Sequence, residues 1–560
     1  MLSSETGTHQ GCPLGPLGFA LAIQPVLEEL QDKGELIWSS WYLDDGILLG
    51  SPEKVSEAFT WLQLKLAERG LVINQQKCEA WGPRVAPFSA THPTVACCEW
   101  GPGSGTKVLG CPVNFPQSTD FAEAHWKATC TKLEHTVQRV TQVTDLQMAH
   151  HLLRTTLDAC KVTHLLRATD CYRSDAGVRE ADAIILTGFE DLLGQGLPAA
   201  QRVQVGLPFA SGGCGIRSPL SIRPAARIAA LATYHTSGAD RIGAPHYARQ
   251  VSAALVTPVL QELAARLGPN FDPVARWLGS LESISKADRE HTQQRWWSDA
   301  LGKKAVLTLL DQLPPREQAR LLEQQNSIGV AFMTTAPSTA LHTSISSDQY
   351  RLGLKWWLGM PLILEADGPM LCSGCQQTCD HLGDHLLCCR RNNFNNRHAA
   401  VQESLSSILT ESGQGHTREV RIPNVPDSQC RPADLLLRAW DNGTDTAMDL
   451  TICHGWQISE QTTAVKRDRW RQFLCRKEKD KHLKYDALCR QAQWSFRALA
   501  FGTWGGVGPE AAKSLHRILK RAAGWQEGDL RAARQEELRQ GLGLTLMRHV
   551  WRLLESKNFQ

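Results

Sequence analysis

Two adjacent aspartates, Asp44 and Asp45, are the first residues along the chain whose types and spacing could do chemistry. They stand between the apolar runs 41–43 and 47–49, and such a pattern predicts a β-hairpin with the acids at its tip. Neighbouring carboxylates repel each other and hard oxygen ligands suit magnesium, so we expect a Mg²⁺ site there. The alternative is an ordinary Asp-Gly turn without a metal.

A second group of possible ligands lies between residues 372 and 389, where a Cys-x-x-Cys pair is followed by further His and Cys residues. Thiolate and imidazole groups at such spacing are what tetrahedral zinc requires. We expect a Zn²⁺ site formed by Cys372, Cys375, His385 and Cys389. The spacing also allows His381 or Cys388 in place of the last two, and the alternative is a set of buried thiols without a metal.

Apolar periodicity predicts the elements that position Asp44 and Asp45. A helix is expected from Pro13 to about Glu29, kinked at Pro25. After the hairpin, Ser51 and Pro52 predict the start of a second helix. Its apolar positions recur at helical spacing and it stops at Gly70.

The Tyr-Leu-Asp-Asp sequence at residues 42–45 resembles the Tyr-x-Asp-Asp box of reverse transcriptases. Residues 6–19, 70–77 and 108–110 resemble the flanking motifs of that family, in order and at its spacing. The resemblance implies that Asp44 and Asp45 hold Mg²⁺ and that Lys77 contacts the phosphates of a dNTP. It also implies that an RNA template and the nucleotide are supported by Gln10, Gly11 and Pro13.

Polymerases of this family use a further aspartate from a strand well before the Gly-Pro turn, whereas this sequence starts at Met1, ten residues before Gly11. Two-metal phosphoryl transfer requires more than two carboxylates. We therefore expect a 5′-truncated palm that is inactive alone.

The middle of the chain is predicted to be helical. Residues 118–194 suit a polymerase thumb by their position, and residues 211–218 resemble a Gly-Gly-x-Gly segment of non-LTR retrotransposon proteins. Helical patterns continue through residues 223–325, with breaks near 244, 269 and 314. Tryptophan pairs at 296–297 and 356–357 follow a cation; they could stack on bases, but we expect them in the core.

The segments after the zinc cluster resemble the restriction-like endonuclease of site-specific non-LTR retrotransposons. They are Arg397-His398, the Arg-Pro-Ala-Asp sequence that ends at Asp434, and a second acid, Asp449. Apolar runs at 435–437 and 447–453 predict neighbouring strands that bring the two acids to one edge. Such a site binds Mg²⁺ and presents a water to a DNA phosphate. The alternative is two unrelated surface acids.

The resemblance also implies a cation near the scissile phosphate, and we expect Lys484 with Tyr485 on a basic helix at about 461–491. Lys477, Lys479 and Lys481 compete for this role. Residues 461–560 hold 21 Lys+Arg against 10 Asp+Glu, which is typical of a phosphate-binding face. Arg397, His398, Tyr485, Lys513 and Arg517 are the expected contacts to nucleic acid, and a solvated helix face is the alternative.

Length and composition agree with several globular domains, since 560 residues include 42% hydrophobic and 21% charged residues. Neither a transmembrane run nor a secretory signal is predicted, and 18 cysteines without such a signal indicate reduced thiols. The family resemblance implies a nuclear protein.

We therefore expect an α+β multidomain protein from a truncated non-LTR retrotransposon. Its expected parts are a palm (1–115), a helical thumb (116–200), a helical linker (201–365), a zinc knuckle (366–392), an α/β restriction-like endonuclease (393–525) and a helical tail (526–560). The resemblance implies that the parent activity is target-primed reverse transcription on a DNA target. Two alternatives are a Mg²⁺-dependent nicking enzyme only, and a non-catalytic nucleic-acid-binding pseudogene product.

Overall fold

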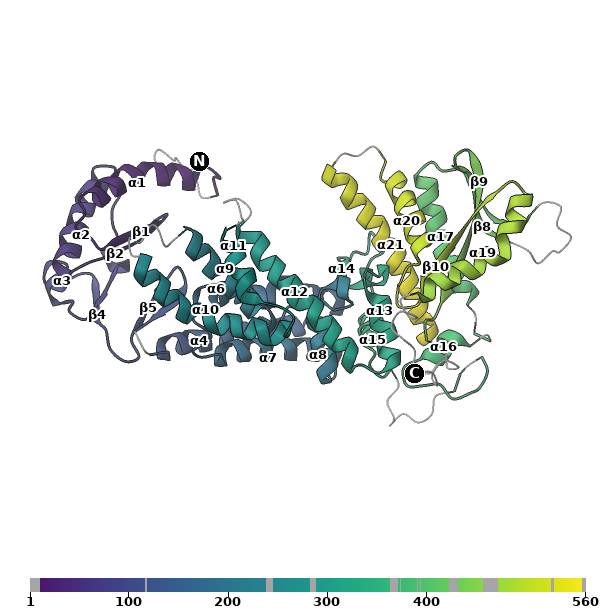
Figure 1. Cartoon of the computed structure of the whole chain (residues 1–560), viewed down its shortest axis with the longest axis horizontal. Coiled ribbons are helices and arrows are strands. Elements are labelled where there is room, and N and C mark those ends of the chain that lie inside the picture. The colour runs from purple at the N-terminus through teal and green to yellow at the C-terminus, as the bar shows by residue number, and fades with distance from the viewer. Residues whose placement is uncertain are drawn as a thin grey trace.

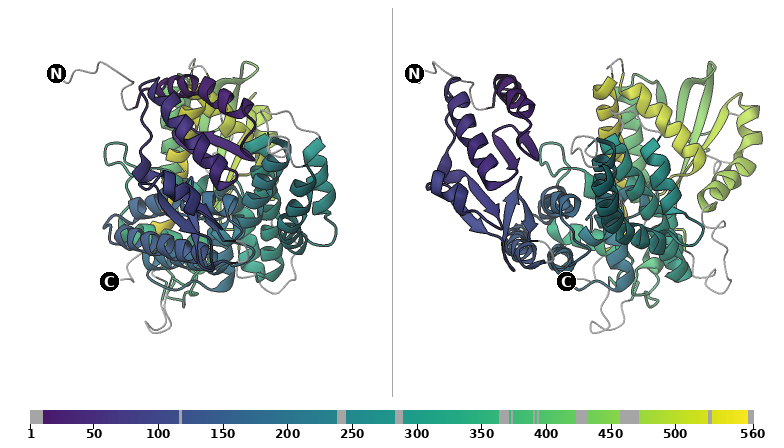
Figure 2. Two further views of the ribbon diagram at one scale, coloured as in Figure 1. Left: turned by 90° about the vertical axis from the view of Figure 1, so that its left-hand side faces the viewer. Right: turned by 60° about the vertical axis from the view of Figure 1, so that its left-hand side comes forward.

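The computed structural model describes residues 11–115, 118–237, 245–282, 289–362, 371–372, 374–389, 391–392, 394–422, 432–456, 472–524 and 528–555. The molecule is elongated, with the N-terminal unit at one end, helices in the middle and a four-stranded sheet at the other end (Figures 1 and 2). Within the described part of the chain, no helix has the length and apolar character needed to cross a membrane.

The N-terminal unit contains short strands and helices around two small cores. Its elements are α1 (Gly15–Asp32), β1 (Trp38–Tyr42), β2 (Asp45–Leu49), α2 (Pro52–Ala67), β3 (Glu79–Gly82), α3 (Ala86–Thr91), β4 (Ala96–Glu99), β5 (Gly105–Val108) and β6 (Cys111–Asn114). The strands form three separate two-stranded sheets. Both predicted helices are present, and Pro25 lies inside α1.

Helix α2 shows how local sequence sets these boundaries. The Ser51 hydroxyl accepts a hydrogen bond from the backbone N–H of Lys54, and Pro52 occupies the first turn. Phe59, Leu62 and Leu66 are buried on one face. The chain leaves the helix at Gly70, which adopts a φ of +75°.

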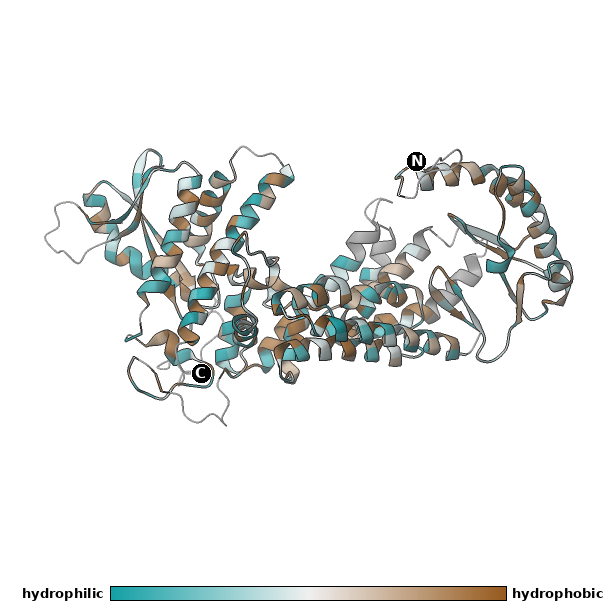
Figure 3. Ribbon diagram, turned by 180° about the vertical axis from the view of Figure 1, so that it is seen from behind, coloured by the Kyte–Doolittle hydropathy of each residue, from teal (hydrophilic) through white to brown (hydrophobic). Residues whose placement is uncertain are grey.

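The middle of the molecule is helical, as predicted. The helices are α4 (Asp120–Thr141), α5 (Leu146–Leu152), α6 (Thr163–Ala168), α7 (Ala176–Leu193), α8 (Ala199–Gly206), α9 (Pro219–Ser237), α10 (Pro245–Leu267), α11 (Pro273–Glu282), α12 (Arg289–Gln312), α13 (Pro315–Gln324), α14 (Ala331–Thr334) and α15 (Ser347–Leu358). Hydrophobic and hydrophilic residues alternate along them (Figure 3), as expected where one face is buried. Trp297, Trp356 and Trp357 are at most 1% exposed, so the expectation that the tryptophan pairs serve the core is confirmed for these three.

The C-terminal sheet has the strand order β10-β9-β8-β7. Its strands are β7 (His416–Val420), β8 (Ala433–Asp441), β9 (Thr444–Cys453) and β10 (Ser495–Gly502), and only β9 and β10 are parallel. Leu435 and Leu437 face the core that includes α17 (Asn395–Glu411), whereas Leu436 packs with α19 (Phe473–Gln491) on the other face. Two helices therefore enclose the strands that carry Asp434 and Asp449.

One hydrophobic core runs from β6 and α4 to the end of α21 (Gly528–Leu554). Helix α21, which we expected as a tail, packs against α14, α15, α17 and α20 (Pro509–Ala522). Leu546, Val550 and Trp551 are fully buried. The thumb, linker, knuckle and nuclease segments thus share a core across the predicted boundaries.

Candidate functional sites

The β1–β2 hairpin places the two aspartates at its tip, as predicted. Tyr42 and Asp45 are paired across the strands, and Leu43 has a φ of +53°, which suits a tight hairpin turn. Both carboxylates are exposed. A side chain at Gly46 would collide with the indole ring of Trp41, so this hairpin requires glycine after the acid pair.

The other predicted residues of the N-terminal unit lie at its surface. Lys77 ends a short 3-10 turn and is exposed. Gly11 and Pro13 are exposed just before α1, and Gln10 lies outside the described residues. The β5–β6 hairpin turns at Leu109, whose carbonyl accepts a hydrogen bond from Nε2 of His164 at 3.0 Å.

The predicted cysteine and histidine residues converge. Ligand atoms of the following residues all lie within 4.8 Å of one another: Cys372, Cys375, His385 and Cys389. His381 is exposed, and the Cys388 thiol donates to the carbonyl of Trp456 at 3.6 Å. Among the residues that the structure describes, no other group of three or more His, Cys, Asp or Glu side chains is as close. A Cys₃His set at this spacing fits tetrahedral Zn²⁺.

Hydrogen bonds from backbone N–H groups favour metal binding by this cluster. Although burial opposes the thiolate form, the N–H groups of Cys375 and Gly374 lower the pKa of Cys372 to about 6. The carboxylate of Asp380 accepts N–H groups of the first turn of α16 (Asp384–Cys388), including that of His385 at 2.7 Å. A thiolate and a fixed imidazole are therefore available together.

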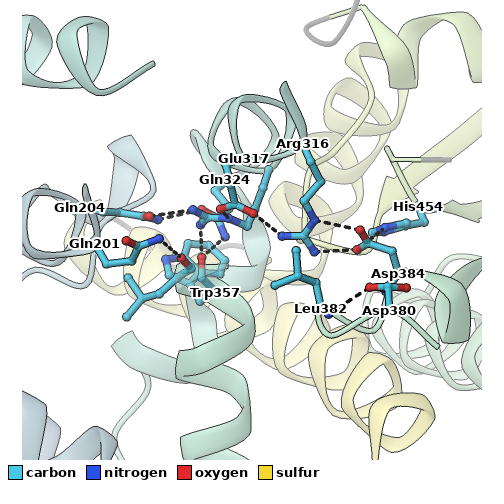
Figure 4. Close-up of polar contacts among 12 residues, drawn as sticks. Gln201, Gln204, Arg316, Glu317, Gln324, Trp357, Asp380, Leu382, Asp384 and His454 are labelled. Carbon is cyan, nitrogen blue, oxygen red and sulfur yellow. Dashed lines mark hydrogen bonds and ion pairs between the residues drawn. The ribbon is translucent and has the colours of Figure 1, made fainter. Parts of the chain in front are cut away.

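A buried polar network joins the cluster to the sheet. The guanidinium of Arg316, on α13, donates two hydrogen bonds to Asp384 at 2.9 and 2.6 Å (Figure 4). Asp384 also contacts Nε2 of His454 at 3.0 Å, and Nδ1 of His454 contacts the hydroxyl of Thr503 at 2.6 Å. Arg316 and His454 hold the pKa of Asp384 well below its usual range, although burial opposes them. A linker helix, the knuckle and the end of β9 are thus held together.

The same network reaches the Gly-Gly-x-Gly segment. Glu317 bridges Arg316 and Arg320 at 2.5 and 2.7 Å. Arg320 donates to the side chain of Gln204, whose amide donates to the carbonyl of Gly212 at 2.8 Å. Figure 4 shows the part of this network that runs from Gln204 past Glu317 and Arg316 to Asp384. The glycine segment is therefore a buried packing element.

The glycine-rich segment at 501–510 surrounds an acid that we did not anticipate. The carboxylate of Glu323 accepts a hydrogen bond from the N–H of Trp504 at 2.8 Å. A Cβ atom at Gly502 or Gly506 would collide with the Glu323 side chain. Burial raises the pKa of Glu323 to about 8. These glycines therefore make room for a buried carboxyl group, whose neutral form is favoured by burial.

The two acids of the predicted nuclease lie side by side. Leu435 pairs with Met448, so Asp434 on β8 stands opposite Asp449 on β9. The Oδ2 atom of Asp434 accepts the N–H of Leu450 at 2.6 Å and lies 3.1 Å from Nε2 of His398. The prediction that neighbouring strands carry the two acids is confirmed, and their role as metal ligands stays a prediction.

The cation next to these acids is Lys481, which corrects our expectation for Lys484. The Nζ atom of Lys481 lies 2.7 Å from Oδ2 of Asp449, whereas Nζ of Lys484 lies over the ring of Tyr485. Burial, and then the charge of Asp434, raise the pKa of Asp449 to about 6 although Lys481 opposes them. A carboxylate that is 4% exposed requires positive charge nearby.

Two residues expected to contact nucleic acid are buried within the protein, which corrects those predictions. Tyr485 is buried and packs against Phe496. Arg397 is 4% exposed and donates to a main-chain carbonyl on β9. By contrast, Lys513 and Arg517 are exposed, although Arg517 also pairs with Asp441 at 2.7 Å, so their contacts with nucleic acid stay predictions.

Residues 2–113, the segment that contains the hairpin with two aspartates, match the protein-family model described as Reverse transcriptase (RNA-dependent DNA polymerase). The N-terminal part of this mixed helix-and-strand chain is therefore similar to a reverse transcriptase domain. No curated protein is similar enough to the chain to count as a match.

Proposed function

We propose that the chain combines a reverse transcriptase segment with a Mg²⁺-dependent DNA endonuclease of the kind found in site-specific non-LTR retrotransposons. In the parent element, the nuclease would nick chromosomal DNA in the nucleus and the polymerase would extend the nick on an RNA template. The observation that supports the nuclease most strongly is the contact of Lys481 with Asp449, opposite Asp434 on the neighbouring strand.

The residues present fit a hard divalent cation. Asp434 and Asp449 offer oxygen ligands, and the raised pKa of buried Asp449 indicates that its ionised form needs more positive charge than Lys481 supplies. Bound between these acids, Mg²⁺ would activate a water for attack on the scissile phosphate. His398 donates to Asp434 and orients it, and the Lys481 ammonium stabilises the negative charge that develops on the phosphate.

The test is nicking of supercoiled plasmid in Mg²⁺ by the full chain. Asp434→Asn removes a metal ligand with little change in volume, and we expect it to abolish nicking. The matched control is Asp445→Asn, because Asp445 lies on β9, near the turn from β8, and pairs with Arg438 at 2.6 Å. No nicking by the unaltered chain at any Mg²⁺ concentration would contradict the proposal.

A second candidate is nucleic-acid binding without cleavage. It is favoured by the fact that each acid already has a polar partner, the imidazole of His398 for Asp434 and the ammonium of Lys481 for Asp449. In that case, DNA binding would survive Asp434→Asn and would weaken steeply as salt is raised.

A further inference from the structure

The side chain of His482, on α19, stands between two carboxylates. Its Nδ1 atom lies 2.8 Å from Asp486, one turn further along the same helix, and its Nε2 atom lies 2.6 Å from Glu510, in the first turn of α20. A neutral imidazole carries a single N–H group, whereas the imidazolium ion donates from both nitrogens. Only the charged form of His482 can therefore donate to both acids.

The groups around the ring favour this charged form. Although burial opposes it, hydrogen bonds to Glu510 and Asp486 raise the pKa of His482 above its ordinary value. The other charged groups at this place are Arg497 on β10, which donates to Oε1 of Glu510 at 3.3 Å, and Glu478, one turn earlier on α19. His482 therefore keeps its charge to a higher pH than an ordinary histidine, and it loses the charge as the pH rises further.

The same two helices are joined by a second contact. The carboxylate of Glu478, which is 4% exposed, accepts the N–H groups of Glu510 at 3.1 Å and Ala511 at 2.9 Å. A Cβ atom at Gly508 would collide with this carboxylate, so the approach of α19 to the start of α20 is close. Glu478 and His482 are four residues apart, and one face of α19 therefore contacts the first turn of α20 at both positions.

This contact between helices bears on the nuclease site because α19 also carries Lys481. Lys481 precedes His482 in the sequence, and its Nζ atom lies 2.7 Å from Asp449 on β9. When His482 loses its proton, one ring nitrogen presents a lone pair to a carboxylate, and the contact with the two acids becomes less favourable. A shift of α19 away from α20 would move Lys481 with it.

We propose that His482 is a positioning residue of the nuclease, whose charged form holds α19 against α20 and thereby keeps Lys481 next to Asp449. Loss of this charge as the pH rises would then weaken nicking. This inference rests on the proposed function. The pH dependence would come from a residue that acts through Lys481.

The test is the rate of plasmid nicking in Mg²⁺ by the full chain, measured from about pH 6 to about pH 9. His482→Gln removes the charge, and thermal unfolding checks its fold. The matched control is His516→Gln, because His516 is an exposed histidine on α20. We expect His482→Gln to nick about tenfold more slowly than the unaltered chain at about pH 6. The two rates should become equal at about pH 9, where the unaltered chain has also lost the charge.

The control and the pH profile make the outcomes distinguishable. His516→Gln should follow the unaltered chain at every pH. A rate for His482→Gln that differs from the unaltered chain by the same factor at every pH, or that equals the rate of the control, would overturn the role of His482 and leave the nuclease proposal standing. No nicking by the unaltered chain at any pH would overturn both.

The charge of His482 can also be measured without nicking. In protein with labelled histidine, an NMR titration should show one ring with a pKa above the ordinary value of a histidine, and this signal should be absent from His482→Gln. Titration of the His482 ring at or below the ordinary value would overturn the inference.

Discussion

The ammonium of Lys481 and the carboxylate of Asp449 meet at 2.7 Å between α19 and β9. Lys481 is four residues before Tyr485, which is buried on the sheet, so the two side chains share one face of α19. This face packs against the sheet, and it therefore also places Lys481 next to Asp449. We expect Lys481→Ala to reduce plasmid nicking about 100-fold, since the phosphate loses its nearest cation. Lys484→Ala is the matched control and should retain nicking, and equal losses in both variants would contradict the assignment.

The zinc cluster gives a prediction that separates two adjacent cysteines. We expect about one zinc per chain by atomic absorption, and Cys389→Ser should lose it because a ligand of the tetrahedral set is gone. Cys388→Ser should retain the metal, since the Cys388 thiol contacts Trp456 instead. Loss of zinc in both variants, or in neither, would show that the ligand set is different.

Arg316 gives a prediction on stability. Arg316→Ala leaves buried Asp384 and Glu317 without their shared cation, and we expect a cost of about 3 kcal/mol or more. Arg539→Ala breaks a half-buried pair with Glu536 and should cost at most about 1 kcal/mol. The measurement is the midpoint of thermal unfolding, and similar shifts in the two variants would argue against a stabilising network.

Glu323 gives a pH dependence. Its pKa is about 8 in the folded chain and close to about 4.3 when unfolded. The folded state therefore keeps a proton that the unfolded state loses, and stability falls as pH rises between these values. Glu323→Gln removes this pH dependence of the free energy of unfolding, so the variant should lose less stability between pH 5 and about pH 8 than the unaltered chain. Parallel unfolding midpoints across that range would refute the protonated form.

The hairpin acids give a prediction on polymerisation. Among the described residues, no third candidate ligand lies with Asp44 and Asp45 within 4.8 Å, and a two-metal polymerase needs more than two carboxylates. We expect no primer extension on a poly(rA) template by this chain in Mg²⁺. Template-dependent incorporation that disappears in Asp45→Asn would contradict this expectation.

Signals that act over a few residues made part of the fold predictable. The turn at Asp44, the cap at Ser51 and the stop at Gly70 are each determined by neighbours in the sequence, and the structure has all three. The choice between Cys388 and Cys389 could not be made in this way. It depends on where the five-residue helix α16 ends, which spacing does not reveal.

Contacts between segments that are distant in sequence account for the site residues that the sequence did not predict. The face of α19 that packs on the sheet decides between Lys481 and Lys484, and burial of Tyr485 on that face was not expected. Glu323 and Trp504 are 181 residues apart in sequence, and no local pattern connects them.

The burial of α21 has a consequence for how this protein is made. Its apolar residues, up to Leu554, complete a core that begins at Cys111. During translation, the earlier helices therefore leave the ribosome with a large apolar surface that nothing yet covers. Native packing of α14, α15, α17 and α20 therefore has to wait for the last helix, and a premature stop codon before residue 528 would give a product prone to aggregation and degradation.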